Sequence, residues 1–276
     1  MARRLDQAGY RIQGWTRTAA TAAWLNDIGT LALTTSAAVH GARAIIVSLP
    51  DSATVDAVLL HDETTEAISP GAIVIDTSST DPDSARRQSD YLRGIGVHHL
   101  DAPVSGGTRG AGAGELAIMV GGDPDTFSAA EGLLATLGRP TLIGPSGAGQ
   151  LAKLCNQIIV AVTIGAVAEG LALADQAGGS LARIVGALHG GFADSRILRE
   201  HGERMIQEDF SPGGAVRLQL KDLTAALGVA ESHGLNLRFT KLARDLYQQL
   251  VGDGYGDFDH SALYLATNRT GVGGDG

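Results

Sequence analysis

The sequence predicts an α/β domain with a doubly wound parallel sheet, followed by an all-α domain led by a long helix. Short apolar runs alternate with helix-like stretches from Tyr10 to about Ile143. Several runs are apolar at consecutive positions, which is typical of strands covered by helices on both faces. After Gly149 the apolar residues recur at helical spacing. We therefore expect two domains, residues 1–146 and residues 147–276.

The expected strands lie in YRIQGW, AIIVSLP, AIVIDTS, VHHLDAP, LAIMVGG and TLIGP, at 10–15, 44–50, 72–78, 97–103, 116–122 and 141–145. Strands separated by helices indicate a parallel sheet. The second domain should begin with a helix over 150–176, and further helices should follow near 181–190, 194–207, 216–233 and 238–251. A glycine-rich end, TGVGGDG, should fray.

Composition favours small-molecule chemistry over binding to nucleic acid or a membrane surface. The net charge is −9, from 30 acidic and 21 basic residues, and no long basic run occurs. The apolar run around 158–167 is short for a membrane span and contains glycine. The single cysteine, Cys155, excludes an internal disulfide and fits a cytoplasmic protein. We expect it to be a small buried hydrophobe, and the histidines show no metal-ligand spacing.

The beginning of the chain lacks one expected feature. A dinucleotide-binding domain starts with a strand, a G-x-G-x-x-G turn and a helix, because the glycines bring the pyrophosphate to backbone N–H groups. Residues 1–9 already resemble the later turns of that helix. A later match, GAGQLA at 147–152, is followed by helices alone, so we interpret it as a helix-entry turn.

Two segments carry residues suited to chemistry. In DAPVSGG, Ser105 with the backbone of Gly106 and Gly107 could hold a carboxylate, although a glycine-rich turn between two strands explains the pattern equally well. Further on, Lys153, Asn156 and Gln157 lie near one face of a helix. A lysine near the domain junction could protonate a developing alkoxide, whereas the alternative is a solvated surface lysine.

The motifs together resemble the β-hydroxyacid dehydrogenase family, which includes 3-hydroxyisobutyrate dehydrogenases and tartronate semialdehyde reductases and is related to 6-phosphogluconate dehydrogenase. The resemblance extends over nearly the whole chain. It rests on LPDSATVDAVL, DTSSTDP, DAPVSGG, the Lys153/Asn156 helix and LKDL at 220–223, in the family's order and spacing. It implies a Rossmann-like first domain and an NAD(P)-dependent oxidoreductase acting on a small β-hydroxyacid.

The resemblance also implies roles for individual residues. Lys153 would be the general acid and base, and Asn156 would orient the substrate, with Gln157 as a further candidate for that role. Ser105, Gly106 and Gly107 would bind its carboxylate. The cofactor would contact Leu49, Pro50, Thr54, Ser79 and Lys221; Ser79 stands where the family more often has threonine.

The charge near the second expected strand predicts the cofactor. NAD enzymes usually place an acidic residue after this strand for the ribose hydroxyls. Here the segment is Thr16, Arg17 and Thr18, which could bind a 2′-phosphate. We therefore expect NADP, with NAD as the alternative. During reduction the lysine would donate a proton to the oxygen as hydride reaches the carbon, which requires a lowered lysine pKa.

The helical domain is expected to line the cleft through Phe192 and Asp194, with Ser195, Asp259, His260 and Ser261 as further candidates. It should also form a homodimer or homotetramer. Two other functions stay open. One is an imine reductase, which typically lacks the catalytic lysine. The other is a truncated, non-catalytic member that acts as a binding or dimerisation module, and for the chain as it begins we expect weak NADPH binding.

Overall fold

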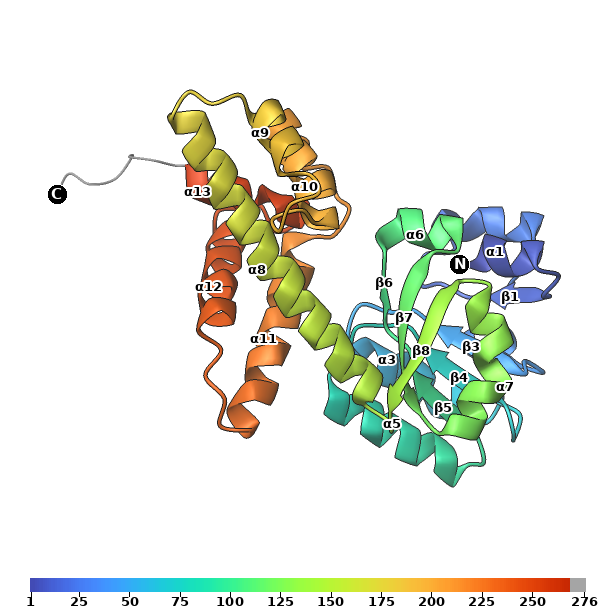
Figure 1. Cartoon of the computed structure of the whole chain (residues 1–276). Helices are drawn as coiled ribbons and strands as arrows, with labels where there is room; N and C mark the ends of the chain where they lie inside the picture. Colours follow the sequence, from blue (N-terminus) through green and yellow to red (C-terminus); the bar gives the residue numbers. More distant parts are fainter. Residues whose placement is uncertain (269–276) are drawn as a thin grey trace. The chain divides into compact units, whose positions relative to one another are not determined.

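The computed structural model describes residues 1–268 and divides into two compact units, Met1–Lys153 and Leu154–Gly276 (Figure 1). The glycine-rich end at 270–276 lies outside the described residues. The division falls inside helix α8, Ala148–Gln176, near whose start we expected the second domain to begin.

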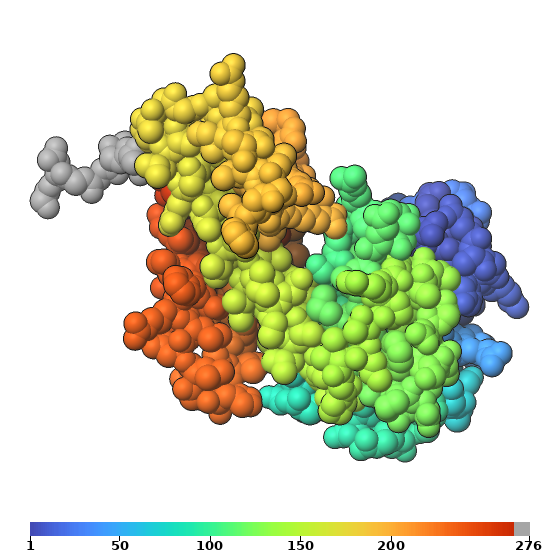
Figure 2. All heavy atoms as spheres, in the orientation of Figure 1, coloured from blue at the N-terminus to red at the C-terminus, as the bar shows by residue number. Residues whose placement is uncertain are grey.

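The first unit begins with a small parallel sheet. Helix α1, Ala2–Gln7, leads into β1, Ile12–Gly14; the 3-10 helix η1, Ala19–Asp27, and β2, Gly29–Leu31, follow. Strands β1 and β2 pair with each other and with no other strand among the described residues. Figure 2 shows these first residues, in blue, against the green α6 region, which α1 contacts.

The main sheet has six strands, in the order β3-β4-β5-β7-β6, with β8 paired to β7. The strands are β3 Ala44–Val47, β4 Ile73–Asp76, β5 His98–Asp101, β6 Val104–Ser105, β7 Leu116–Gly122 and β8 Gly138–Gly144. The helices of this unit after η1 are α2 Thr35–Val39, α3 Ser52–Leu59, α4 Asp62–Thr65, α5 Pro82–Gly94, α6 Gly107–Ala113 and α7 Pro124–Ala135. Buried Ile75, Leu100 and Ile118 belong to one of its cores.

All six strands expected from the sequence are confirmed, but the sheet is mixed rather than purely parallel. Strands β3, β4 and β5 run parallel, whereas β7 runs antiparallel to both β5 and β6. Two parallel strands must be joined by a crossover connection of a dozen or more residues, usually a long helix. The chain between β5 and β7 forms strand β6 and the short helix α6 instead. The glycine-rich turn expected there is helix α6, which ends at Gly114 in the left-handed conformation (φ +76°).

The second unit is helical, as expected. After α8 come α9 Leu181–Leu188, α10 Arg196–Gln207, α11 Val216–Ser232, α12 Arg238–Gly252, the 3-10 helix η2 His260–Ala262 and α13 Leu263–Asn268. Their core includes Ala161, Ile164 and Ala168 of α8, with Leu223 and Tyr247.

Helix α8 differs from the sequence-based expectation in the exposure of Cys155 and in its length. Cys155 is exposed rather than buried, because it lies off the helix face that carries the buried residues Leu154, Ala161 and Ile164. The whole helix is also longer than its apolar run. It is long and apolar enough to cross a membrane, which is equally true of core helices in proteins outside membranes.

Candidate functional site

The start of α8 is held by a buried carboxylate at the carboxyl end of β5. Asp101 accepts hydrogen bonds from the backbone N–H of Gly147 (2.8 Å) and of Gln150 (2.9 Å). Burial raises the pKa of Asp101 to about 6. A Cβ on Gly149 would lie 2.4 Å from the carbonyl oxygen of Met119, so only glycine lets the helix approach the sheet this closely. These contacts confirm that GAGQLA is a helix-entry turn, and they set the position of Lys153.

Lys153 reaches the segment that the sequence singled out for carboxylate binding. Its side chain is only 8% exposed, and Nζ donates to the carbonyl oxygen of Val104 at 2.9 Å. Val104 and Ser105 form β6, and the next residues, Gly106 and Gly107, have φ values of +137° and +63°. Nζ of Lys153 is thus bonded to the residue directly before Ser105, and a buried ammonium, a hydroxyl and a glycine backbone are each groups that bind anions.

The residues expected to contact the cofactor lie at the carboxyl ends of β3 and β4. Leu49 and Pro50 follow β3, Ser79 follows β4, and Thr54 lies in the first turn of α3. The two loops are joined, because the backbone N–H of Leu49 donates to the Ser78 hydroxyl at 2.8 Å. In open α/β sheets this edge is where nucleotide ligands bind.

Gln150, which sequence reasoning did not single out, joins this edge to α8. It is fully buried, and its amide donates to the carbonyl oxygen of Ser78 (2.9 Å) while accepting from the N–H of Thr80 (3.1 Å). The loop that carries Ser79 is therefore held against the helix that carries Lys153. The only sequence signal was a polar residue on the apolar helix face.

Thr16, Arg17 and Thr18 follow β1, in the separate two-stranded sheet. Arg17 and Thr18 are exposed, and Thr16 is half-buried. They lie at the carboxyl end of a parallel strand, as a residue that selects between NAD and NADP would.

In the second unit, Gln157 is the centre of a polar cluster. Its Nε2 donates to Asp222 Oδ2 at 2.7 Å and to Gln219 Oε1 at 3.2 Å, and its Oε1 accepts from Asn156 Nδ2 at 2.9 Å. Lys221 forms an ion pair with Asp222 at 3.3 Å. Asn156, Gln157 and Lys221, chosen from the sequence, are thus linked through Gln219 and Asp222, which were not chosen. The sequence signal for Asp222 was its place in the LKDL motif, directly after Lys221.

Phe192 and Asp194 are not joined to this cluster. Phe192 is fully exposed in the loop between α9 and α10. Asp194 pairs with Arg199 and accepts from the N–H of Gly190 at 2.9 Å. The bond from Arg199, followed by that from Gly190, lowers the pKa of Asp194 to about 2. The contacts of Asp194 are those of a residue that braces its own loop.

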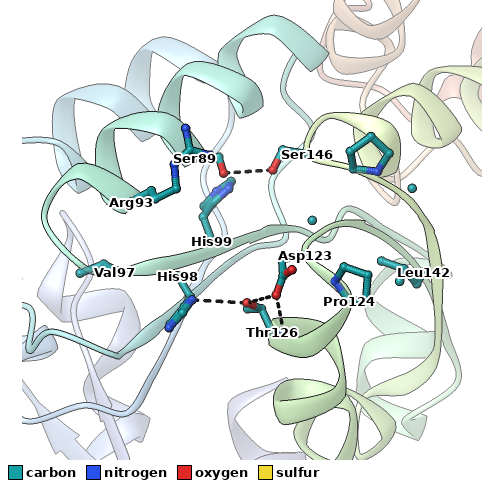
Figure 3. Close-up of a pocket in the computed structure, with 13 residues that line it drawn as sticks. Ser89, Arg93, Val97, His98, His99, Asp123, Pro124, Thr126, Leu142 and Ser146 are labelled. Atoms are coloured by element: carbon teal, nitrogen blue, oxygen red, sulfur yellow. Dashed lines mark hydrogen bonds between the residues drawn. The ribbon is translucent and has the colours of Figure 1, made fainter.

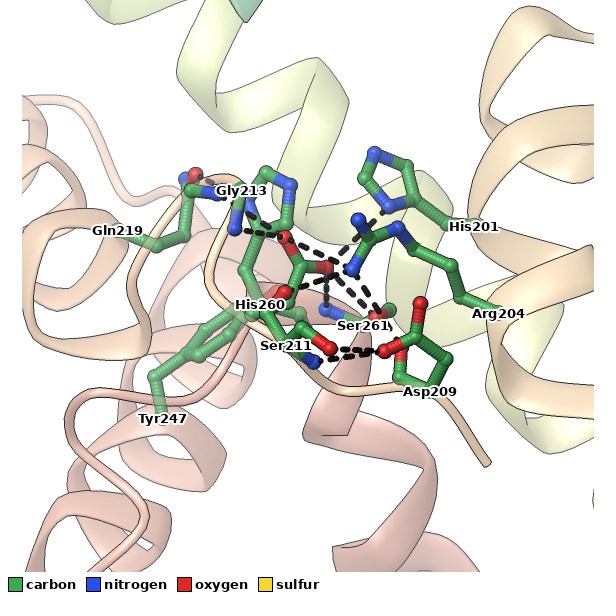
Figure 4. A network of polar contacts seen from close by, with 11 residues as sticks. His201, Arg204, Asp209, Ser211, Gly213, Gln219, Tyr247, His260 and Ser261 are labelled. Atoms are coloured by element: carbon green, nitrogen blue, oxygen red, sulfur yellow. Dashed lines mark hydrogen bonds and ion pairs between the residues drawn. The ribbon is translucent and has the colours of Figure 1, made fainter. Parts of the chain in front are cut away.

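Asp259 centres a second polar network, shown in Figure 4. One carboxylate oxygen accepts from the N–H and hydroxyl of Ser261, and the other accepts from the N–H of Gly213 and Gly214. His201 Nδ1 lies 3.5 Å from the first of these oxygens, and Arg204 Nη1 lies 3.8 Å from the second. Burial favours the neutral acid, yet these bonds and the neighbouring His260 hold the pKa of Asp259 well below its ordinary value.

His201, Asp259 and His260 offer ligand atoms within 4.8 Å of one another, a grouping that no sequence spacing indicated. The two carboxylate oxygens of Asp259 already accept hydrogen bonds from four N–H and O–H groups. The guanidinium of Arg204 adds a positive charge, which disfavours a metal cation here. We interpret the group as a structural brace for the loop before α11.

A pocket of about 570 Å³ lies elsewhere in the first unit, as Figure 3 shows. It is lined by the start of β5 at His98 and His99 and by the start of α7 at Asp123, Pro124 and Thr126. The predicted site follows the other end of β5, and none of its residues lines this pocket. Burial lowers the pKa of His99 to about 4, and neither ring nitrogen has a hydrogen-bond partner among the described residues.

Two family models together match almost the whole chain. Residues 1–162 match the NAD binding domain of 6-phosphogluconate dehydrogenase, and residues 147–267 match the NAD-binding domain of NADP-dependent 3-hydroxyisobutyrate dehydrogenase. Among curated proteins, 2-hydroxy-3-oxopropionate reductase of Escherichia coli K12 is 41% identical over 96% of this chain and 92% of its own length. A probable mitochondrial 3-hydroxyisobutyrate dehydrogenase-like protein of Arabidopsis thaliana is 32% identical over 96% of this chain and 80% of its own.

Solved structures agree with these matches. The 3-hydroxyisobutyrate dehydrogenase of Mycobacterium tuberculosis, solved with L-serine, has a TM-score of 0.86 at 29% identity and covers 96% of this chain and 93% of its own. An imine reductase from Pseudomonas sp. is more distant, with a TM-score of 0.62 at 22% identity over 96% and 93% of the two chains, and shares the fold alone. The protein therefore belongs to the β-hydroxyacid dehydrogenase family of NAD(P)-dependent oxidoreductases.

Proposed function

We propose that the protein interconverts a small β-hydroxyacid and its aldehyde, of the 3-hydroxyisobutyrate or 2-hydroxy-3-oxopropionate type, with Lys153 as general acid and base. The observation that carries the proposal is the bond from buried Lys153 to Val104, directly before Ser105, Gly106 and Gly107. Relatives with these activities in their names support the substrate class.

The chemistry follows from charge. The ammonium of Lys153 stabilises negative charge on the substrate oxygen during reduction and then donates the proton to it. In oxidation the same nitrogen accepts that proton. Ser105 and the backbone N–H groups of Gly106 and Gly107 hold the carboxylate, which places the reacting carbon beside the lysine. The nicotinamide, when bound, supplies or accepts the hydride.

The loops after β3 and β4 fit a dinucleotide cofactor. The carboxyl edge of a parallel sheet presents Leu49 and Pro50 beside the loop of Ser79, and the bond from Leu49 to Ser78 holds the two loops together. Thr54 lies in the first turn of α3. We assign cofactor contacts to these loops, to Lys221 and to the segment after β1.

We further propose that the preferred cofactor is NADP. Arg17 is exposed after β1, between two threonines whose hydroxyls can donate to a phosphate. An acidic residue, which would bind the ribose hydroxyls of NAD, is missing from Thr16 to Thr18. The description of one matching family model as NADP-dependent supports this preference.

We propose a cytoplasmic homodimer or homotetramer that associates through the helical unit. Ile159 and Leu173 of α8 are 64% and 73% exposed, and Phe239 of α12 is 77% exposed. A groove of about 550 Å³ between α8 and the start of α12 includes Ile159 and Phe239. Such apolar surface favours burial by a second copy. Sedimentation of the protein and of Phe239→Glu tests this, and a monomeric parent would contradict it.

The function is tested by kinetics with a panel of hydroxyacids. Glycerate, 3-hydroxyisobutyrate and 4-hydroxybutyrate should be compared as substrates with NADP⁺ and NAD⁺. We expect turnover of one of the first two, both of which are β-hydroxyacids, and little turnover of the third, whose hydroxyl lies one carbon further from the carboxylate. Absence of turnover with all three would contradict the proposal and favour the non-catalytic module.

A further inference from the structure

The pocket at the start of strand β5 contains a buried histidine whose hydrogen-bonding groups are unused. His99 lines this cavity of about 570 Å³ and is 5% exposed, and neither ring nitrogen bonds to any residue that the structure describes. Buried polar atoms in folded proteins nearly always have a partner, because an unpaired one costs stability. The ring of His99 is therefore able to bind a polar group of a ligand.

Two serine hydroxyls lie beside this ring, as Figure 3 shows. Ser89 is on helix α5 and Ser146 follows strand β8, and both are half-buried. Ser146 Oγ donates to Ser89 Oγ at 3.0 Å, so the hydroxyl hydrogen of Ser89 is left to donate elsewhere. A neutral imidazole also carries one N–H. Three separate elements thus each bring one donor to this side of the pocket.

The charge on the same side favours an anion. Arg93 lies one helical turn after Ser89 on α5 and also lines the pocket, and it forms an ion pair with the exposed Asp90 at 2.6 Å. Burial lowers the pKa of His99 to about 4, because no anion near the ring compensates the lost hydration of its charged form. A carboxylate on the ligand would provide that compensation and accept from the three donors.

The remaining walls limit the ligand to one negative charge. Asp123 on α7 lines the pocket apart from the two serines (Figure 3), and its Oδ2 accepts from the N–H and hydroxyl of Thr126 at 2.9 and 3.0 Å. These bonds lower the pKa of Asp123, so it stays charged and would repel a second carboxylate. Val97 and Leu142 give the pocket apolar surface, which suits an aliphatic chain.

We propose that this pocket binds a small aliphatic monocarboxylate, whose oxygens accept hydrogen bonds from Ser89, Ser146 and His99. The ligand replaces the bond between the two serines, and its chain lies against the apolar wall. All of these residues belong to the unit Met1–Lys153. The site lies at the opposite end of β5 from Asp101 and goes beyond the proposed function, on which it does not depend.

Calorimetric titration of the whole protein with three six-carbon compounds tests the proposal. Hexanoate carries one carboxylate, adipate carries two, and 1-hexanol carries none. We expect hexanoate to bind with a dissociation constant of about 1 mM. Adipate should bind at least about tenfold more weakly because of Asp123, and 1-hexanol should do so because it lacks the charged acceptor.

Two variants identify the site. Ser146→Ala removes one donor, and His99→Leu replaces the ring by an apolar side chain of similar volume. His99→Leu should fold, because it removes two unpaired buried nitrogens. Each variant should weaken hexanoate binding about tenfold or more. Ser128→Ala is the matched control and should bind as the parent does, since this exposed serine of α7 bonds only to its own helix.

The outcomes separate this pocket from the predicted substrate site. Ser105→Ala should leave hexanoate binding unchanged, and a loss of binding there but not in Ser146→Ala would place the acid in the substrate site and overturn the proposal. Undetectable hexanoate binding, or adipate or 1-hexanol binding as tightly as hexanoate, would also overturn it. So would unchanged binding in both His99→Leu and Ser146→Ala. The proposed function stands or falls separately, by the kinetics with hydroxyacids.

Discussion

We expect the free energy of unfolding of the protein to fall as the pH rises from about 4 to about 6, because the buried Asp101 loses its proton. The variant Asp101→Asn should not show this fall. The carboxyl group is fully buried at the end of β5, where it accepts from Gly147 and Gln150 at the start of α8. Burial raises its pKa from 3.8 to about 6, and the nearby Asp76 raises it further. Asparagine keeps the shape and one acceptor oxygen but carries no charge.

The expected magnitude follows from linkage. Between the two pKa values the folded protein holds a proton that the unfolded chain has released, so stability is fully present below about pH 4 and falls as the pH rises through about 6. A shift from 3.8 to about 6 corresponds to about 3 kcal/mol in the free energy of unfolding. The lost bond to one backbone N–H costs the variant about 1–3 kcal/mol, a penalty that is independent of pH.

The assay is urea unfolding of parent and variant at several pH values between 4 and 7. The difference in free energy of unfolding should move in favour of Asp101→Asn by about 3 kcal/mol across this range. Asp125→Asn, an exposed carboxylate in the first turn of α7, is the control and should show no such movement. A constant difference between parent and Asp101→Asn would refute the reasoning that burial penalises this carboxylate.

The other predictions concern α8 and the cofactor. Gly149→Ala places a Cβ 2.4 Å from the carbonyl oxygen of Met119 and should destabilise the fold by at least about 3 kcal/mol. The control is Gly132→Ala on α7, where no atom lies within 4 Å of the added Cβ, and it should be neutral or stabilising in the same unfolding assay. Lys153→Ala should lower kcat by about 10²–10⁴-fold, and Lys153→Arg should not restore it, because arginine keeps its proton; near-normal turnover would contradict the role of Lys153. Arg17→Glu should shift the ratio of kcat/KM for NADP⁺ over NAD⁺ towards NAD⁺ by about 10–100-fold, and an unchanged ratio would show that Arg17 does not contact the phosphate.

Local pattern was sufficient to predict most elements. LAIMVGG is strand β7 from its first residue to its last, and the helical spacing after Gly149 yielded α9, α10, α11 and α12 within a few residues. Each depends on side chains close together in sequence, so the period of apolar residues reports the element directly. Strand β2, Gly29–Leu31, was missed because it is short and partly exposed, which leaves almost no apolar run.

Long-range packing explains the elements that were misread. The glycine-rich segment after Gly106 forms α6 although glycine disfavours helices, and Gly110 lies close against Leu116 of β7. The antiparallel direction of β7 depends on the route the chain takes through β6 and α6, which apolar periodicity does not encode. Cys155 was expected to be buried from its residue type, but the side of α8 on which it lies decided its exposure.

The sequence by itself determined the family motifs, the two-part organisation into α/β and helical segments, and the spacing of Lys153, Asn156 and Gln157 on one helix, because each depends on neighbours a few residues apart. Only the tertiary structure decided which groups surround them. Asp101 bonds to Gly147, 46 residues later and directly before helix α8, and Gln219 bonds to Gln157 across 62 residues. Such pairs form because packing brings distant elements together and buried polar groups must find partners there.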